Sequence, residues 1–276
     1  MNWREFQTLQ RVVKLGDRFV SYVTEGSGDP VLLLHGIPTW GYLWHGLIPA
    51  LAKTCRVFAP DLLGFGYSDK SDHFDRSIAR QAEMIDAWMD KLGIERASIV
   101  GHDLGGGVAL RLATLFPHRV TRLCVMNTVC YDSWPIEAML QLGHPKAYHS
   151  LSAANTVATM RQALKQGFAS SQNGELLEGL LAPYTTEVGK LSLIRNAAAL
   201  NTNLTMEISP LLLQMAMPTL ILWGEEDLFQ PVKYGERLAS DIPGARLIRI
   251  RGARHFVMFD RPDEVTEDLV MFLGGS

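Results

Sequence analysis

Short apolar runs alternate with amphipathic stretches along most of this chain. Residues 31–34 are apolar throughout and residues 219–223 nearly so, which is typical of strands buried on both faces of a parallel sheet. Residues 78–92 instead carry apolar side chains at helical spacing and end before Gly93. The alternation predicts an α/β fold with a mostly parallel sheet flanked by helices. Further strands are predicted at residues 20–25, 56–60, 97–100, 120–129 and 246–250, and further helices at residues 105–116, 232–239 and 262–273.

The alternation is interrupted once, between residues 132 and 215. Helix-forming residues dominate this stretch, and the strand pattern returns only after Pro218. We therefore predict a core made of residues 1–131 and 216–276, with residues 132–215 inserted as a helical cap. Open α/β sheets bind ligands at the carboxyl ends of their strands. A cap inserted there is expected to cover the site and to select the substrate.

Composition excludes several other classes of protein. The 276 residues include 26 Lys and Arg against 29 Asp and Glu, a formal net charge of −3, which argues against a nucleic-acid partner. The longest apolar stretch, residues 211–223, is broken by Gln214 and Pro218 and is too short for a membrane span of ~20 residues. The amino terminus lacks the apolar core of a signal peptide, and the three cysteines have no CxxC spacing. A cytoplasmic location is expected. The sequence carries no signal for an oligomeric state.

The most informative motif is the pentapeptide Gly101-His102-Asp103-Leu104-Gly105, which lies between a predicted strand and a predicted helix. Its spacing is that of the nucleophile elbow, G-x-S-x-G, with aspartate in place of serine. The glycines permit a sharp turn that lifts the central side chain out of the sheet. A helix start beneath that side chain favours an ionised carboxylate. We predict that Asp103 is a nucleophile. The simpler alternative is that it only caps the helix that follows.

Three other segments supply the groups that a nucleophile of this kind needs. The strand at residues 31–34 runs into His35-Gly36-Ile37-Pro38, where the backbone N–H of Ile37 would form an oxyanion hole together with that of Leu104. Asp227 follows the strand at residues 219–223, and His255 follows the strand at residues 246–250. The order nucleophile, acid, base predicts an Asp103–His255–Asp227 triad. His35 is predicted to be structural.

With these motifs the chain resembles the α/β-hydrolases over essentially its whole length, and most closely the haloalkane dehalogenase and epoxide hydrolase branch, whose nucleophile is aspartate. Residues 35–39, HGIPT, resemble the HGxPT segment of that branch, and residues 61–70, DLLGFGYSDK, resemble its D-x-x-G-x-G-x-S-D-K turn. The resemblance implies an α/β-hydrolase fold with an inserted cap. No His, Cys and Asp cluster has metal-ligand spacing, and the elbow accounts for the glycines around Asp103, so no metal or organic cofactor is expected. We expect a hydrolase that acts on a small apolar molecule.

An aspartate nucleophile changes the expected reaction. Its carboxylate attacks a saturated carbon, displacing halide or opening an epoxide, and leaves an alkyl ester on Asp103 itself. Water activated by His255 would then hydrolyse that ester, with Asp227 orienting the imidazole. Some similar dehalogenases place the acid after an earlier strand. That place is close to Asn127 here, and Asp132 lies nearby, so we keep Asp227 as the acid.

The substrate is less clearly indicated than the nucleophile. Haloalkane dehalogenases of this branch carry a halide-holding tryptophan directly after the nucleophile, and some add an asparagine in the HGxP segment. This chain has Leu104 and Ile37 at those places. Epoxide hydrolases use two cap tyrosines. The leaving-group candidates are therefore the indoles of Trp40 and Trp134 for a halide and the phenols of Tyr131, Tyr148 and Tyr184 for an epoxide.

We expect a haloalkane dehalogenase-like hydrolase, with epoxide hydrolysis as the alternative. Two further classes stay open. Some similar proteins run cofactor-independent oxygenation with a related triad, and oxygen uptake would distinguish them. A non-enzymatic small-molecule receptor on the same fold would bind without turnover.

Overall fold

A single eight-stranded sheet organises the chain. The computed structural model describes residues 1–171 and 174–274. The strand order is β1-β2-β4-β3-β5-β6-β7-β8. The first two strands pair antiparallel, as do β2 and β4, and all later pairings are parallel. The strands are β1 Arg11–Leu15, β2 Arg18–Glu25, β3 Asp29–Leu34, β4 Cys55–Pro60, β5 Ala97–His102, β6 Val120–Met126, β7 Thr219–Gly224 and β8 Arg246–Ile250.

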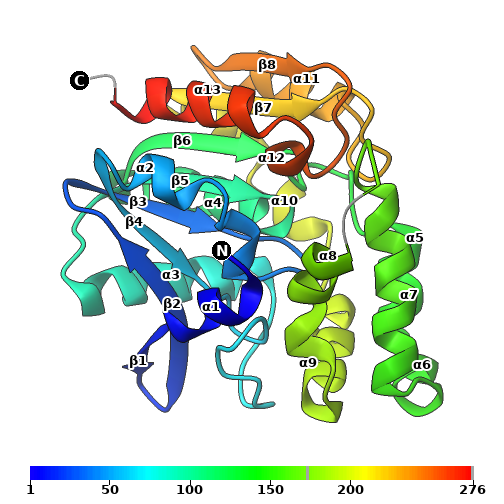
Figure 1. The fold of residues 1–276 in the computed structure, drawn as a ribbon. Helices are drawn as coiled ribbons and strands as arrows, with labels where there is room; N and C mark the ends of the chain where they lie inside the picture. Colours follow the sequence, from blue (N-terminus) through cyan, green and yellow to red (C-terminus); the bar gives the residue numbers. More distant parts are fainter. Residues whose placement is uncertain (172–173, 275–276) are drawn as a thin grey trace.

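Apolar side chains cover both faces of this sheet, as the sequence predicts. In β3, Val31 and Leu33 belong to one apolar cluster while Leu32 and Leu34 belong to another, because successive strand side chains point to opposite faces. The first cluster includes helices α2 (Ile48–Leu51), α12 (Val257–Asp260) and α13 (Pro262–Gly274), and the second includes α3 (Ile78–Leu92), α4 (Leu104–Leu115) and α11 (Lys233–Asp241). Helices therefore flank the sheet on both sides (Figure 1).

Two expectations from the sequence need correction. Helix α1 (Trp3–Thr8) and strand β1 precede the first predicted strand. Strand β1 is short and half open to solvent, with Val12 65% exposed, so no buried apolar run marks it. The strand predicted at residues 120–129 ends at Met126, because the backbone turns at Asn127 with a positive φ of 40°.

Between β6 and β7 the described chain contains helices and no strand. These are α5 Glu137–Gly143, α6 Pro145–Ser150, α7 Ala153–Gln166, α8 Gly174–Leu181, η3 Ala182–Tyr184, α9 Glu187–Ala198, α10 Asn203–Met206 and η4 Ser209–Gln214. Helices α5–α9 lie together at one end of the sheet, drawn in green in Figure 1. The division of the chain into core and cap domains stays a prediction.

A buried polar contact joins the helical insertion to the rest of the molecule. Arg76 Nη1 donates to Ser192 Oγ and to Asn196 Oδ1 of α9, each at 2.7 Å. Both α9 side chains in turn donate to the backbone carbonyl of Gly64. Helix α9 is thus held against the loop that follows β4. In the described part of the chain, no helix is both long and apolar enough for a membrane crossing.

Candidate active site

The turn between β5 and α4 lifts Asp103 above the sheet. Asp103 has a φ of +51°, a strained conformation for a side chain other than glycine. A Cβ on Gly105 would lie 2.2 Å from the carbonyl oxygen of Leu34, and one on Gly101 would lie 2.5 Å from that of Gly105. Glycine is therefore required on both sides of Asp103. The elbow predicted from residues 101–105 is present.

The two carboxylate oxygens of Asp103 have different surroundings. Oδ1 accepts the backbone N–H of Ile37 at 2.9 Å, and the N–H of Leu104 also bonds this carboxylate. Oδ2 lies 3.6 Å from Nε2 of His255. A Cβ on Gly36 would come within 2.3 Å of Oδ1, so this close approach needs glycine as well. The N–H of Ile37 thus holds one oxygen, while the other faces the histidine.

His255 is oriented from its other ring nitrogen. Nδ1 lies 2.9 Å from Asp227 Oδ2, and the Asp227 side chain is fully buried. Asn127 Nδ2 donates to the same oxygen at 2.6 Å, while the backbone N–H of Phe229 donates to Oδ1 at 2.7 Å. Asp103, His255 and Asp227 are therefore brought together as the sequence predicts. From the sequence, Asn127 is of interest only because it occupies the place where some dehalogenases carry the acid. In the structure its side chain donates to the carboxylate of Asp227.

Burial and charge oppose each other in this group. Burial raises the pKa of Asp103, against the charge of His255 and the N–H groups of Leu104 and Ile37, which lower it. Burial lowers the pKa of His255, but the charge and hydrogen bond of Asp227 and the charge of Asp103 together outweigh it, so the pKa lies above its usual value of 6.5. The imidazole therefore gains a proton more readily here than in water.

Two further polar residues hold the loops around the site. His35 Nε2 accepts the N–H of Leu62 at 3.0 Å, and burial lowers the pKa of His35 to about 4, which keeps it neutral as this bond requires. Asp61 accepts the N–H groups of Gly41 and Tyr67 at 2.8 and 2.7 Å. The structural role predicted for His35 agrees with this geometry. The turn at residues 61–70 likewise serves to fix loops.

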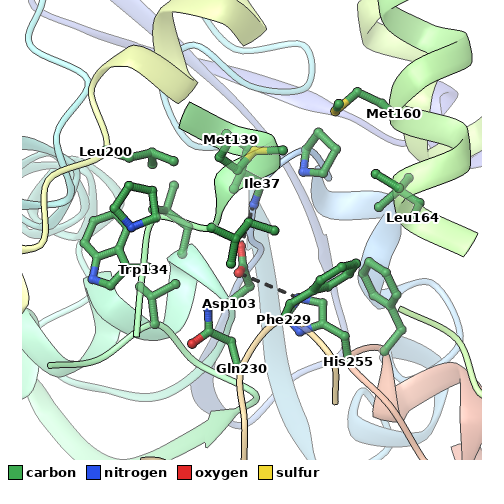
Figure 2. A pocket seen from close by; sticks show the side chains of 17 residues that line it. Ile37, Asp103, Trp134, Met139, Met160, Leu164, Leu200, Phe229, Gln230 and His255 are labelled. Carbon is green, nitrogen blue, oxygen red and sulfur yellow. Dashed lines mark hydrogen bonds and ion pairs between the residues drawn. The ribbon is translucent and has the colours of Figure 1, made fainter. Parts of the chain in front are cut away.

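A mostly apolar pocket lies above Asp103 (Figure 2). Its volume is about 50 Å³, room for a few water-sized groups, since each needs roughly 10–15 Å³. Polar side chains at its wall are Asp103, His255 and Gln230, together with the indole of Trp134. The remaining described lining residues are Ile37, Pro38, Leu104, Val129, Pro135, Ile136, Met139, Met160, Ala163, Leu164, Leu200, Phe229 and Phe256.

The three predicted phenol donors do not line this pocket, which corrects the sequence-based expectation. Tyr131 donates its hydroxyl to Asp241 at 2.7 Å and stacks under Arg237. Tyr184 is fully buried and donates to the backbone carbonyl of Thr39. Tyr148 is 40% exposed on α6. The roles of Tyr131 and Tyr184 do not follow from the sequence, because the partner of each comes from a distant segment of the chain.

The two predicted indole donors are also engaged elsewhere. Trp40 is fully buried outside the pocket, and its Nε1 donates to the carbonyl of Gly179 at 2.8 Å. Trp134 does line the pocket, but its Nε1 donates to Thr205 Oγ1 at 2.7 Å. Neither N–H is directed at the space above Asp103. No sequence motif marks Gln230, the polar residue that does line the pocket. Among the described residues, no cluster of three side chains suited to a metal ion occurs.

Comparison with known families agrees with this architecture. A family model described as alpha/beta hydrolase fold matches residues 29–262. The chain belongs to the α/β-hydrolase family, and the fold class predicted from the sequence is confirmed. It is an enzyme of the hydrolase class.

Individual relatives refine the class. Haloalkane dehalogenase 2 of Mycobacterium bovis is 28% identical over 265 residues, covering 92% of this chain and 91% of that protein. Cis-3-alkyl-4-alkyloxetan-2-one decarboxylase of Shewanella oneidensis is 26% identical, covering 91% and 84%. The crystal structure of an alpha/beta hydrolase fold protein from Burkholderia ambifaria superposes with a TM-score of 0.90 at 28% identity, covering 95% and 97%. The resemblance to the dehalogenase branch is confirmed, whereas relatives of similar identity carry the names of different reactions.

Proposed function

We propose that this chain is a haloalkane dehalogenase-like hydrolase that uses Asp103 as its nucleophile and needs no cofactor. The observation that carries the proposal is the asymmetry of the Asp103 carboxylate. Oδ1 is held by the N–H of Ile37 at 2.9 Å, while Oδ2 faces the cavity side beside His255. A carboxylate held at one oxygen presents the other to an electrophile.

The first step is displacement at a saturated carbon. Oδ2 of Asp103 attacks the carbon, the new bond is an Asp103 alkyl ester, and halide leaves with the electron pair of the carbon–halogen bond. Burial favours this step because the attacking carboxylate is weakly solvated in a cavity lined mainly by apolar side chains. The charge of His255 and the bonds from Leu104 and Ile37 lower the pKa of Asp103 against the effect of burial, and so favour the ionised carboxylate.

The second step is hydrolysis of the ester. His255 takes a proton from water, the hydroxide adds to the Asp103 carbonyl carbon, and negative charge collects on Oδ1, to which the Ile37 N–H donates. The N–H of Leu104 is the second proposed donor to this charge. Breaking the bond from the carbonyl carbon to Oδ2, with the proton of the added hydroxyl passing to Oδ2, releases the alcohol and restores the carboxylate. The imidazolium then loses its proton to water, which balances the released halide. The sum is one haloalkane and one water converted to one alcohol and one hydrogen halide. Asp227 stabilises the imidazolium that forms.

The titratable groups in the pocket favour a halide over an epoxide. Opening an epoxide forms an alkoxide, which needs an acid, whereas halide leaves without a proton. Among the lining residues that the structure describes, Asp103 and His255 are the only titratable ones. Both are already engaged in the reaction, and Tyr131, Tyr148 and Tyr184 lie elsewhere. The small apolar cavity fits a short alkyl chain.

Isotope labelling in a single turnover tests the covalent route. With excess enzyme in ¹⁸O-water and a short bromoalkane, the alcohol should carry the unlabelled Oδ2, and Asp103 should gain the solvent oxygen. Mass spectrometry of the alcohol and of the peptide containing Asp103 measures both. Labelled alcohol in the first turnover with unlabelled Asp103 would show direct attack by water. A parallel panel of epoxides, read by diol formation, tests the alternative.

A further inference from the structure

Gln230 is a buried polar residue that the reaction as described does not use. It lines the pocket from the loop after β7 and is only 2% exposed. Within the described structure its side-chain Oε1 has no hydrogen-bond partner. This oxygen is an acceptor, which a departing halide cannot bond, so what the residue offers a leaving group is the N–H donor of the same carboxamide at the pocket wall.

The backbone fixes this residue relative to the triad. The carbonyl of Gln230 accepts the indole N–H of Trp223 at 2.8 Å, and Asp227, three residues earlier, accepts the N–H of Phe229 at 2.7 Å. The loop that carries the acid therefore also carries Gln230. Figure 2 shows the Gln230 side chain below Asp103 in this view, with its amide nitrogen on the side towards Asp103.

No other side-chain donor in the described lining is available to a leaving group. The indole N–H of Trp134 is bonded to Thr205, and His255 is bonded through Nδ1 to Asp227 and faces Asp103 through Nε2. The side chains beside the nucleophile, Leu104 and Ile37, are apolar. A carboxamide N–H is the only neutral donor left at the wall.

We propose that the Gln230 carboxamide donates to the leaving group displaced by Asp103. This assignment rests on the proposed function, because it needs a displacement at Asp103. In the transition state, negative charge moves onto the leaving atom as its bond to carbon breaks, and the amide N–H stabilises that charge without transferring a proton. Gln230 thus makes the pocket specific for leaving groups that accept a hydrogen bond but need no acid.

The test measures ester formation alone, in a His255→Gln background that blocks the second step. Gln230→Met keeps the length of the side chain and removes its amide, and Met139→Leu is the control because it also lines the pocket and alters no polar group. Chlorobutane, bromobutane and iodobutane are the probes. Quenched samples are analysed by mass spectrometry for the alkyl adduct on Asp103.

Gln230→Met should slow ester formation from chlorobutane by about 10- to 100-fold, the effect of losing one hydrogen bond to developing charge. The effect should shrink from chloride to bromide to iodide, because iodide is the weakest hydrogen-bond acceptor. Met139→Leu should show no such trend. The thermal midpoint of Gln230→Met should be equal to or above that of its parent, since the substitution removes an unpartnered buried oxygen.

Each contrary result has a distinct meaning. An unchanged rate in Gln230→Met, or the same fold loss for all three halides, overturns the assignment of Gln230 and leaves the Asp103 mechanism intact. An absence of adduct from all three halides in His255→Gln itself overturns the Asp103 mechanism, and the assignment of Gln230 with it.

Discussion

The two walls of the pocket are built on different principles. On the wall formed by the strand ends, every polar group of the Asp103–His255–Asp227 set has a partner within 3.6 Å. The wall formed by residues 134–200 contributes apolar side chains and one indole whose N–H is already bonded. The first wall fixes where bonds are made, and the second fixes what shape can enter. Under the proposed function, the comparison teaches that the reaction type and the shape of the substrate are encoded separately.

The largest effect is expected at the nucleophile. Asp103→Asn removes the attacking oxygen while keeping its shape and its bond from Ile37. Turnover should fall by about 10⁴-fold or more, in line with the loss of a covalent nucleophile. Steady-state halide release measures this, and circular dichroism checks that the variant folds. Activity within tenfold of the parent would remove Asp103 from the reaction, and with it the contrast between the two walls.

The Asp103→Asn variant should also change the pKa of His255. The charge of Asp103 contributes to the raised pKa of His255, so removing that charge should lower the pKa of His255 towards or below 6.5. An alkyl ester on Asp103 removes the charge in the same way, which lowers the pKa of His255 at the step that needs a base. Imidazole titration by NMR in the parent and in Asp103→Asn measures the shift. A rise or no change in Asp103→Asn would contradict it.

A smaller loss of turnover is expected when Asp227 is replaced. A carboxylate placed at position 127, after the neighbouring strand β6, should restore part of it. Asp227→Asn should lower turnover by about 10³- to 10⁴-fold, because an amide no longer stabilises the imidazolium. Asn127 Nδ2 lies 2.6 Å from the Asp227 oxygen that also binds His255. A second substitution, Asn127→Asp, places a carboxylate beside the same imidazole.

The double variant Asp227→Asn/Asn127→Asp should therefore regain about tenfold or more over Asp227→Asn alone, since a charge again faces His255. The single variant Asn127→Asp is the control. It places two carboxylates side by side and should lose activity through their repulsion. Turnover of the parent, the two single variants and the double variant gives the coupling free energy between positions 127 and 227. Equal activity of the double variant and Asp227→Asn would show that position 127 does not reach the imidazole.

The contrast between the walls also explains what the sequence could predict. The elbow at residues 101–105 is local, since its glycines are required by contacts with neighbouring backbone, and so Asp103, Ile37 and Leu104 could be assigned from spacing. Asp227 and His255 followed from strand order. The fold followed from apolar runs that are buried in β3, β5 and β7.

The rest depends on partners that spacing does not reveal. Tyr131 meets Asp241 and Trp134 meets Thr205, pairs separated by 110 and 71 residues. The residue type alone does not show whether a hydrogen-bond donor is already bonded to another part of the protein. Gln230 carries no motif, and only its place at the pocket wall, with an unpartnered oxygen, distinguishes it from a surface glutamine.

The smallest effect on chemistry is expected on the second wall, at Trp134. Trp134→Phe keeps an aromatic ring against the pocket and removes the N–H that Thr205 Oγ1 accepts at 2.7 Å. Thr205 also donates to the carbonyl of Tyr131, so the lost bond holds the entrance of the helical insertion. We expect a loss of about 1 kcal/mol in the free energy of unfolding, seen as a fall of about 2–4 °C in the thermal midpoint.

Ester formation in Trp134→Phe should stay within about threefold of its parent for chloride, bromide and iodide alike, because this indole donates to Thr205 and not to the leaving group. The measurement is the adduct assay in the His255→Gln background. A large loss that shrinks from chloride to iodide would mean that the indole turns into the pocket during reaction. The second wall would then supply chemistry as well as shape, and the separation between reaction type and substrate choice would no longer hold.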